Sequence, residues 1–143
     1  RCWRAESGAA PEFVAGHSLG EYSALVVADL STIVKEENKS SNNIAVINIE
    51  GAIMIGEASY GVAGSDTIVK NIKDATKDKS VKAMVLRVNS PGGSVYASEL
   101  ITNALDEFKD TGRPIISSMG DIAASGGVWV TTNSAEIWAE IDT

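Results

Sequence analysis

Two serines in this sequence stand in settings that suit nucleophilic chemistry. Ser125 is followed by two glycines and is expected to open a helix, where unpaired backbone N–H groups and the positive end of the helix dipole favour developing negative charge. Ser18 lies in the pentapeptide Gly-His-Ser-Leu-Gly, which fits the G-x-S-x-G nucleophile elbow. Both are therefore candidate nucleophiles for acyl transfer.

Glycines near Ser125 supply candidate groups for stabilising an oxyanion. Gly92 and Gly93 lack side chains, so their N–H groups can approach a substrate closely, and the N–H of Gly126 can join them. The alternative is that Ser125 only caps a helix and that the glycines only make turns. No cofactor and no metal site is expected.

A serine hydroxyl is a weak nucleophile at neutral pH and needs a neighbouring base. The one histidine, His17, is interpreted as a turn residue. The lysines in the second part of the chain are expected on solvated helix faces or at element ends, where they stay protonated near neutral pH. They are Lys70, Lys73, Lys77, Lys79, Lys82 and Lys109. The sequence therefore offers a nucleophile without an evident base.

Strands and helices alternate around these serines with short connections. Apolar patterning predicts strands at residues 44–55 (bent at Gly51), 83–88, 115–119 and 135–139, and helices at 65–79 (capped by Ser65 and Asp66), 95–109 and 124–132. Such alternation implies parallel strands joined by right-handed crossovers, an α/β fold with a mostly parallel sheet. The loops 89–94 and 120–127 should then meet at the carboxyl edge of the sheet.

The chain divides at a polar stretch, KEENKSSNN. Residues 1–34 are predicted to carry a short strand (13–15), the turn around Ser18 and a helix (21–30); residues 35–43 are a linker; and residues 44–143 are the main core. This first segment would be a strand-turn-helix added to the core.

Composition narrows the possible partners. The chain has 143 residues, 44% hydrophobic and 22% charged, with a net charge of -7, which argues against a nucleic-acid partner. No apolar run is long enough to predict a membrane span, and the first residues lack the apolar segment of an export signal. A single cysteine, Cys2, cannot form an internal disulfide.

The stretch VKAMVLRVNSPGGSVYASELI, followed by SMGDIAASGGVW, resembles the signal peptide peptidase A (protease IV) family. The resemblance covers about residues 44–138. It implies that Ser125 is the nucleophile of a serine-lysine dyad, that Gly92 and Gly93 border the oxyanion hole, and that the core is a partial ClpP/crotonase-like fold. It also implies a peptide substrate, a homo-oligomer and association with the inner membrane.

In that family the lysine base comes from an earlier homologous domain or from a position downstream of where this chain stops at Thr143. The resemblance therefore implies a truncated peptidase core that carries the nucleophile but not the base, with little or no turnover alone.

The string AGHSLGEYSALV resembles the active-site segment of malonyl-CoA:acyl-carrier-protein transacylase over about residues 10–30, with Ser18 matching the acyl-accepting serine. The other functional groups of that cytoplasmic family have no recognisable counterpart, so Ser18 is interpreted as vestigial. Two families meeting across residues 35–43 predict a chimera, in which the first segment could cover an exposed sheet edge. The compartment is not predicted.

Three functions follow from these observations. The first is a peptidase-derived domain with Ser125 and little turnover. The second is a non-catalytic, self-associating folded chimera, because parallel-sheet edges would be exposed. The third is working acyl chemistry, through Ser18 or through Ser125 with a base from a neighbouring chain.

Overall fold

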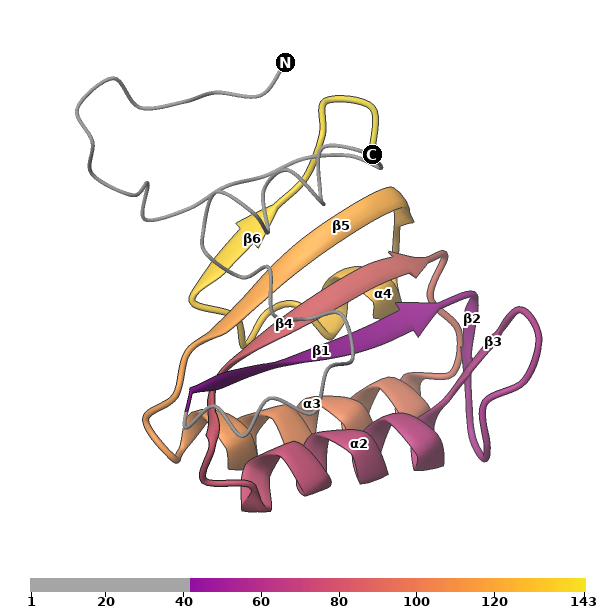
Figure 1. Ribbon diagram of the computed structural model, residues 1–143. Helices are drawn as coiled ribbons and strands as arrows, with labels where there is room; N and C mark the ends of the chain where they lie inside the picture. Colours follow the sequence, from indigo (N-terminus) through magenta and orange to yellow (C-terminus); the bar gives the residue numbers. More distant parts are fainter. Residues whose placement is uncertain (1–41) are drawn as a thin grey trace, which may run out of the picture. The chain divides into compact units, whose positions relative to one another are not determined.

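The structure, a computed structural model, describes residues 42–143 (Figure 1). Its strands are β1 (Asn43–Glu50), β2 (Ala52–Met54), β3 (Val62–Gly64), β4 (Val81–Ser90), β5 (Ile115–Ala123) and β6 (Glu136–Trp138), and its helices are α2 (Ser65–Lys77), α3 (Val95–Lys109) and α4 (Gly126–Trp129). The predicted elements at residues 13–15 and 21–30, with His17 and Ser18, lie outside the described residues.

The main sheet has four parallel strands in the order β1-β4-β5-β6. A second, two-stranded parallel sheet pairs β2 with β3. Helix α2 links β3 to β4, and helix α3 links β4 to β5. The predicted α/β fold, with a mostly parallel sheet and crossover helices, is confirmed.

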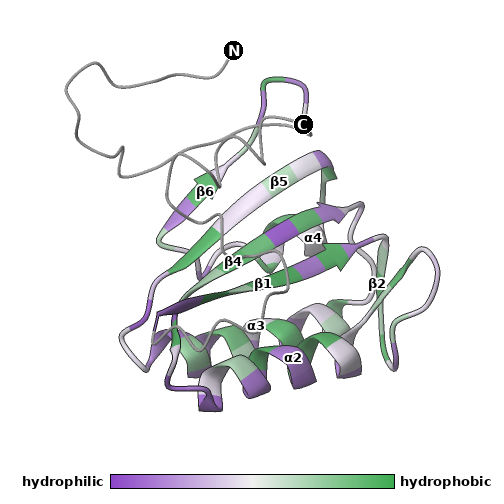
Figure 2. Ribbon diagram, viewed as in Figure 1, coloured by the Kyte–Doolittle hydropathy of each residue, from purple (hydrophilic) through white to green (hydrophobic). Residues whose placement is uncertain are grey.

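Helices α2 and α3 lie side by side on one face of the main sheet (Figure 1). From Met84 to Ser90, residues of β4 alternate between buried and partly buried, as expected for a strand with one face on the core. The apolar stripe of each helix turns toward the sheet, and its polar residues turn outward (Figure 2). The fully buried side chains include Ile49, Ile72, Met84, Leu86, Ile101, Leu105, Phe108 and Ile115.

The helical patterns were predicted well, but the cap of α2 was not. Ile68, Ile72 and Ala75 of this helix are buried as expected. The N-cap, however, is Gly64, which makes no side-chain cap, and the hydroxyl of Ser65 is hydrogen-bonded to the carboxylate of Asp66 at 3.3 Å. The predicted cap by these two residues is therefore wrong, because the helix begins at Ser65 itself.

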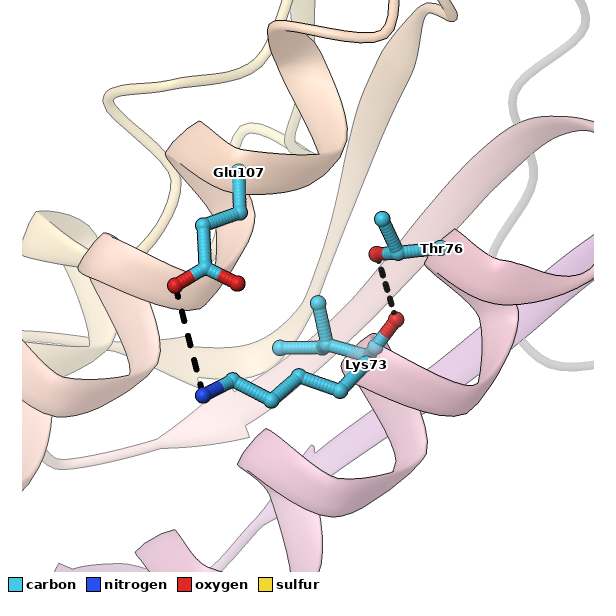
Figure 3. Close-up of polar contacts among 4 residues, drawn as sticks. Lys73, Thr76 and Glu107 are labelled. Carbon is cyan, nitrogen blue, oxygen red and sulfur yellow. Dashed lines mark hydrogen bonds and ion pairs between the residues drawn. The ribbon is translucent and has the colours of Figure 1, made fainter.

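One ion pair joins the outer surfaces of the two covering helices. Lys73 of α2 and Glu107 of α3 approach to 4.0 Å, and Thr76 donates to the Ile72 carbonyl one turn before it at 2.8 Å (Figure 3). Both charged side chains are about half exposed. Such a pair contributes only about 0–1 kcal/mol, so the buried apolar contacts hold the helices together.

The predicted strand at residues 44–55 is two strands in two different sheets. Gly51 has a φ of 86° and turns the chain from β1 into β2, so the predicted bend is present but the strand does not continue through it. Strand β3 was not predicted at all, since three residues carry too little periodicity. Together these short strands lie beyond the end of β1 (Figure 1).

The last elements are shorter than predicted. Helix α4 spans only Gly126–Trp129 instead of residues 124–132, and β6 spans Glu136–Trp138. Strand β5, in contrast, runs to Ala123, four residues beyond its predicted end. The chain between residues 120 and 125 is therefore extended backbone that leads to Ser125, and the dipole of so short a helix is correspondingly small.

None of the helices among residues 42–143 is long and apolar enough to cross a membrane. Within the same residues, no three His, Cys, Asp or Glu side chains are grouped so that they could hold a metal ion.

Candidate active site

Ser125 follows β5 at the carboxyl edge of the main sheet and has an unusual backbone conformation. Its φ is 50° and its ψ is −121°, and it is the only non-glycine residue with positive φ in the described part of the chain. Its side chain is exposed and makes no capping hydrogen bond. A sharp, strained turn that presents a serine hydroxyl to solvent is typical of a nucleophile elbow.

A bulge in β5 delivers the chain to this turn. The register of β4 with β5 runs from Val88 opposite Met119 to Ser90 opposite Ala123, so β5 contains two extra residues there. The side chain of Asn89 fills the interruption, and its Oδ1 accepts a hydrogen bond from the Ile122 N–H at 3.1 Å. Bulges re-aim the residues that follow them, which here changes the path toward Ser125.

The Pro-Gly-Gly loop after β4 lies directly against the serine turn. Gly92 has a φ of 92°, and a Cβ placed on it would lie 2.7 Å from the Gly126 nitrogen and 2.8 Å from the Ser125 Cβ. No side chain other than hydrogen fits in this contact. The structure therefore brings the two loops together, as their positions after parallel strands predicted.

Close packing holds the first residues of α4 in place. A Cβ on Gly126 would overlap the hydroxyl of Ser98 on α3, and a Cβ on Gly127 would lie 2.5 Å from the Ser90 carbonyl oxygen. The Ala124 N–H donates to that same carbonyl at 3.0 Å. The turn is therefore anchored to both α3 and the end of β4.

The three glycine N–H groups proposed for an oxyanion hole differ in their hydrogen bonding. The Gly92 N–H donates to the hydroxyl of Ser90 at 3.1 Å. Within the described residues, the N–H groups of Gly93 and Gly126 donate to no other group. Two backbone donors are thus unused: one on the residue after Ser125, and one on the residue after Gly92, which packs against Ser125.

The direction of the Gly93 N–H follows from its pairing with β2. The Ile53 N–H donates to the Gly92 carbonyl at 2.9 Å, and the Ser94 N–H donates to the Ile53 carbonyl at 2.7 Å. In extended backbone, these two flanking groups point to one side and the N–H of the middle residue points to the other. The Gly93 N–H therefore points away from β2.

In the described residues, no lysine is hydrogen-bonded to Ser125. All six lysines of this part are exposed: Lys70, Lys73, Lys77, Lys79, Lys82 and Lys109. Lys79 and Lys82 line a concavity with Arg113 near the amino ends of β4 and β5, at the other end of the sheet from Ser125.

Several residues of this site were not recognised from the sequence. Ser90 and Asn89 each hold a loop that carries functional groups, yet both had been assigned to a turn and given no role. A hydroxyl and an amide at the end of a buried apolar strand, directly before Pro-Gly-Gly, were the available signal. Ser98 was hidden because it lies inside a helical pattern.

Comparison with other proteins shows a clear relationship to named proteases. No family model matches the chain. Protease 4 of Haemophilus influenzae is 48% identical over 102 residues, which is 71% of this chain and 17% of the relative. Protease 4 of Salmonella typhi is 47% identical over 122 residues, 85% of this chain and 19% of the relative. The chain thus spans about a fifth of the length of these two proteins.

A more distant relative extends the same relationship. The chloroplast serine protease SPPA of Arabidopsis thaliana is 32% identical over 103 residues, 69% of this chain and 15% of the relative. The Salmonella match covers 85% of the chain, so it must include residues on both sides of the predicted linker at 35–43. The comparisons give no support to a transacylase-like segment or to a chimera, which stay predictions.

Three observations are consistent with a serine protease. Ser125 is exposed in a strained turn, the N–H groups of Gly93 and Gly126 are unused within the described residues, and these relatives are named as proteases. Over most of its length, the chain is therefore similar to proteins named Protease 4 and serine protease SPPA.

Proposed function

We propose that residues 42–143 form the nucleophile-bearing part of a serine peptidase in which Ser125 attacks a peptide carbonyl. The observation that carries this proposal is the backbone of Ser125, with its φ of 50° and exposed side chain. A residue that only capped a helix would have no need of a conformation that costs about 1–3 kcal/mol. The protease relatives supply the reaction class and the peptide substrate.

Gly93 and Gly126 are the proposed oxyanion donors. Neither N–H is used within the described residues. Gly92, in the same loop as Gly93, packs against the Ser125 turn. Gly92 contributes space rather than a donor, because its own N–H is bound to Ser90. Each donor of this kind is worth about 2.7–4 kcal/mol of barrier lowering in acyl transfer.

The reaction also needs a base, which we propose is a lysine from outside the described residues. This base takes the Ser125 proton as Oγ bonds to the carbonyl carbon and the carbonyl oxygen becomes an oxyanion. Collapse of the intermediate breaks the C–N bond, the leaving amine takes that proton, and water then hydrolyses the acyl-serine. Without the base, we expect this chain alone to have little or no turnover.

Labelling with a fluorophosphonate tests the proposal directly. The chain is treated with the probe, and intact mass and peptide mass spectrometry locate any adduct, with Ser125→Ala and Ser18→Ala as controls. We expect a slow adduct at Ser125 that disappears in the Ser125→Ala variant. Absence of labelling in the parent chain, with the fold intact by circular dichroism, would contradict an activated serine.

A second candidate function is a non-catalytic domain that self-associates. Large apolar side chains are exposed around the carboxyl edge of the sheet, including Ile55 (61% exposed), Tyr60 (105%) and Val95 (65%). Apolar surface of this kind favours association with another chain. Sedimentation at several concentrations measures it, and an oligomer that also labels at Ser125 would unite the two functions.

Chemistry through Ser18 is a lesser alternative and rests on the sequence motif alone. An adduct at Ser18 in the same labelling experiment, retained in Ser125→Ala, would favour it over the peptidase. The predicted boundaries at residues 34 and 43 stay proposals as well, and limited proteolysis followed by mass measurement would locate them.

A further inference from the structure

Ser90 is the last residue of β4, is fully buried, and connects three segments of the candidate site. Its hydroxyl donates to the Gly51 carbonyl at 2.6 Å and accepts from the Gly92 N–H at 3.1 Å. Its own carbonyl accepts the Ala124 N–H at 3.0 Å. One residue thus contacts the turn between β1 and β2, the Pro-Gly-Gly loop and the residue before Ser125.

The two hydrogen bonds of this side chain require a hydroxyl. A serine Oγ can donate one hydrogen bond and accept another at the same time. Alanine would leave the Gly51 carbonyl and the Gly92 N–H without this partner inside the protein. The bond from Gly92 therefore depends on the chemistry of Ser90 and not only on its size.

The backbone of Gly92 is held on both sides, by Ser90 through its N–H and by Ile53 through its carbonyl. The Gly92 N–H points inward to Ser90, while the Gly92 carbonyl is held by the Ile53 N–H. The bond from Ile53 turns the Gly93 N–H away from β2, and the bond to Ser90 holds the preceding peptide group, so the two bonds together set the conformation of Gly92. Gly92 and Gly93 lack side chains, so without Ser90 their backbone has other conformations available.

We infer that Ser90 is a positioning residue that orients the Gly92–Gly93 backbone so that the Gly93 N–H is available to an oxyanion at Ser125. This inference rests on the proposed function for its catalytic meaning. Its structural content, that the hydroxyl sets the state of the Gly92 and Gly93 amides, is independent of turnover.

Amide spectroscopy of the whole chain, labelled with ¹⁵N-glycine, tests that structural content. Ser90→Ala is compared with Ser90→Thr, which keeps the hydroxyl, and with Ser117→Ala. Ser117 is a suitable control because it is also a fully buried serine with a hydroxyl partner, Ser134 at 2.6 Å, but on β5 away from this loop. Thermal melts of all variants show whether each one folds.

We expect Ser90→Ala to shift the Gly92 and Gly93 amide resonances and to speed hydrogen exchange at Gly92 by about tenfold. Ser90→Thr should restore both toward the parent, and Ser117→Ala should leave both unchanged. Unchanged Gly92 and Gly93 amides in a folded Ser90→Ala chain would overturn the inference. If Ser90→Ala fails to fold, Ser90→Thr and Ser90→Cys test the inference instead. The Gly92 and Gly93 amide resonances should stay near those of the parent in Ser90→Thr, which keeps the hydroxyl. They should shift in Ser90→Cys, which keeps only the side-chain volume.

Fluorophosphonate labelling of the same variants separates this inference from the proposed function. A parent chain that does not label at Ser125 counts against the peptidase, whereas the amide measurements still decide the role of Ser90. If the parent does label, Ser90→Ala should label at least about tenfold more slowly, because one oxyanion donor is misdirected. Equal labelling rates would contradict a positioning role.

Discussion

The two ends of the main sheet are each tied together by one polar side chain, with different results. At the amino end, Arg113 donates to the carbonyls of Ala75, Thr76, Asp78 and Val81 at 2.6–3.2 Å and to the Thr111 hydroxyl at 2.7 Å. Its guanidinium also lies 4.3 Å from the centre of the Phe108 ring. At the carboxyl end, Ser90 ties Gly51, Gly92 and Ala124.

The two ends differ in whether hydrogen-bond donors remain unused. The guanidinium of Arg113 is directed at carbonyl groups of its own chain, so the concavity around it gains structural support rather than a free donor. Around Ser90, the inward bond of Gly92 leaves the N–H groups of Gly93 and Gly126 unused within the described residues, next to an exposed serine. The amino end is hydrogen-bonded to its own chain, and the carboxyl end leaves two donors unused, as the proposed function requires.

The largest expected effect is at Gly92. Gly92→Ala places a Cβ 2.7 Å from the Gly126 nitrogen at a φ of 92°, so it should destabilise the fold by about 3–5 kcal/mol or force the two loops apart. Gly112→Ala is the matched control, since Gly112 has a φ of 79° but nothing within 4 Å of its Cβ position. That change should cost only about 1–2 kcal/mol, the strain of positive φ.

Urea unfolding of both glycine variants measures these two free energies. Similar losses of free energy of unfolding in Gly92→Ala and Gly112→Ala would show that the close contact with the serine turn is not part of the stable fold. The proposed difference between the two ends of the main sheet would then be wrong.

A smaller effect is expected at the amino end. Arg113→Ala removes five donated hydrogen bonds to four carbonyls and one hydroxyl, together with the Phe108 contact, and should lower the free energy of unfolding by about 2–3 kcal/mol. Arg113→Lys should recover only part of this, because an ammonium cannot reproduce the planar fork. Denaturant midpoints measure the loss, and slower fluorophosphonate labelling at Ser125 in a folded variant would contradict the separation of the two ends.

A gain in stability is expected at the serine turn. Ser125→Gly should raise the free energy of unfolding by about 1 kcal/mol, because glycine adopts a φ of 50° without the strain that serine carries there. Ser125→Ala removes the same hydroxyl but keeps the strain, so it should leave stability nearly unchanged. Thermal melts of the pair measure the difference, and equal melting temperatures would mean that the turn stores no strain.

The smallest effect is a pH dependence at Asp78. Hydrogen bonds from the Ser80 side chain and then the Ser80 N–H hold the pKa of this exposed carboxyl below its usual 3.8. Because the folded pKa is the lower one, the stabilisation is fully present above pH 3.8 and is lost as the pH falls through the folded value. Asp78→Asn should therefore lower the melting temperature slightly at neutral pH and not in strong acid. A difference that persists in strong acid would exclude this titration as its cause.

Periodicity was a good guide to the regular elements and a poor one to their ends. Helix α3 begins and ends where its apolar spacing predicted, since Ser94 caps it and the Ile101, Leu105 and Phe108 stripe is continuous. Strand β5, in contrast, runs four residues past its predicted end. Its last residues, around Asp121 and Ile122, are exposed and have no apolar alternation to reveal them. They lie in the bulge, where the Ile122 N–H donates to the Asn89 side chain, and pairing with β4 resumes at Ala123 opposite Ser90.

By itself, the sequence determined the order of strands and helices, their parallel arrangement and the two glycine-rich loops at one edge, because these depend on local patterning and on the handedness of short crossovers. Only the tertiary structure decided that Ser125 adopts positive φ and that Ser90 holds the Gly92 N–H inward. The exposure of every described lysine agrees with what the sequence predicts. The turn at Ser125 is anchored by contacts between residues far apart in the sequence, such as Ser90 with Ala124, which no local pattern contains. The bond from Gly92 to Ser90 joins residues two positions apart, but apolar periodicity does not reveal which hydrogen bonds a buried hydroxyl makes.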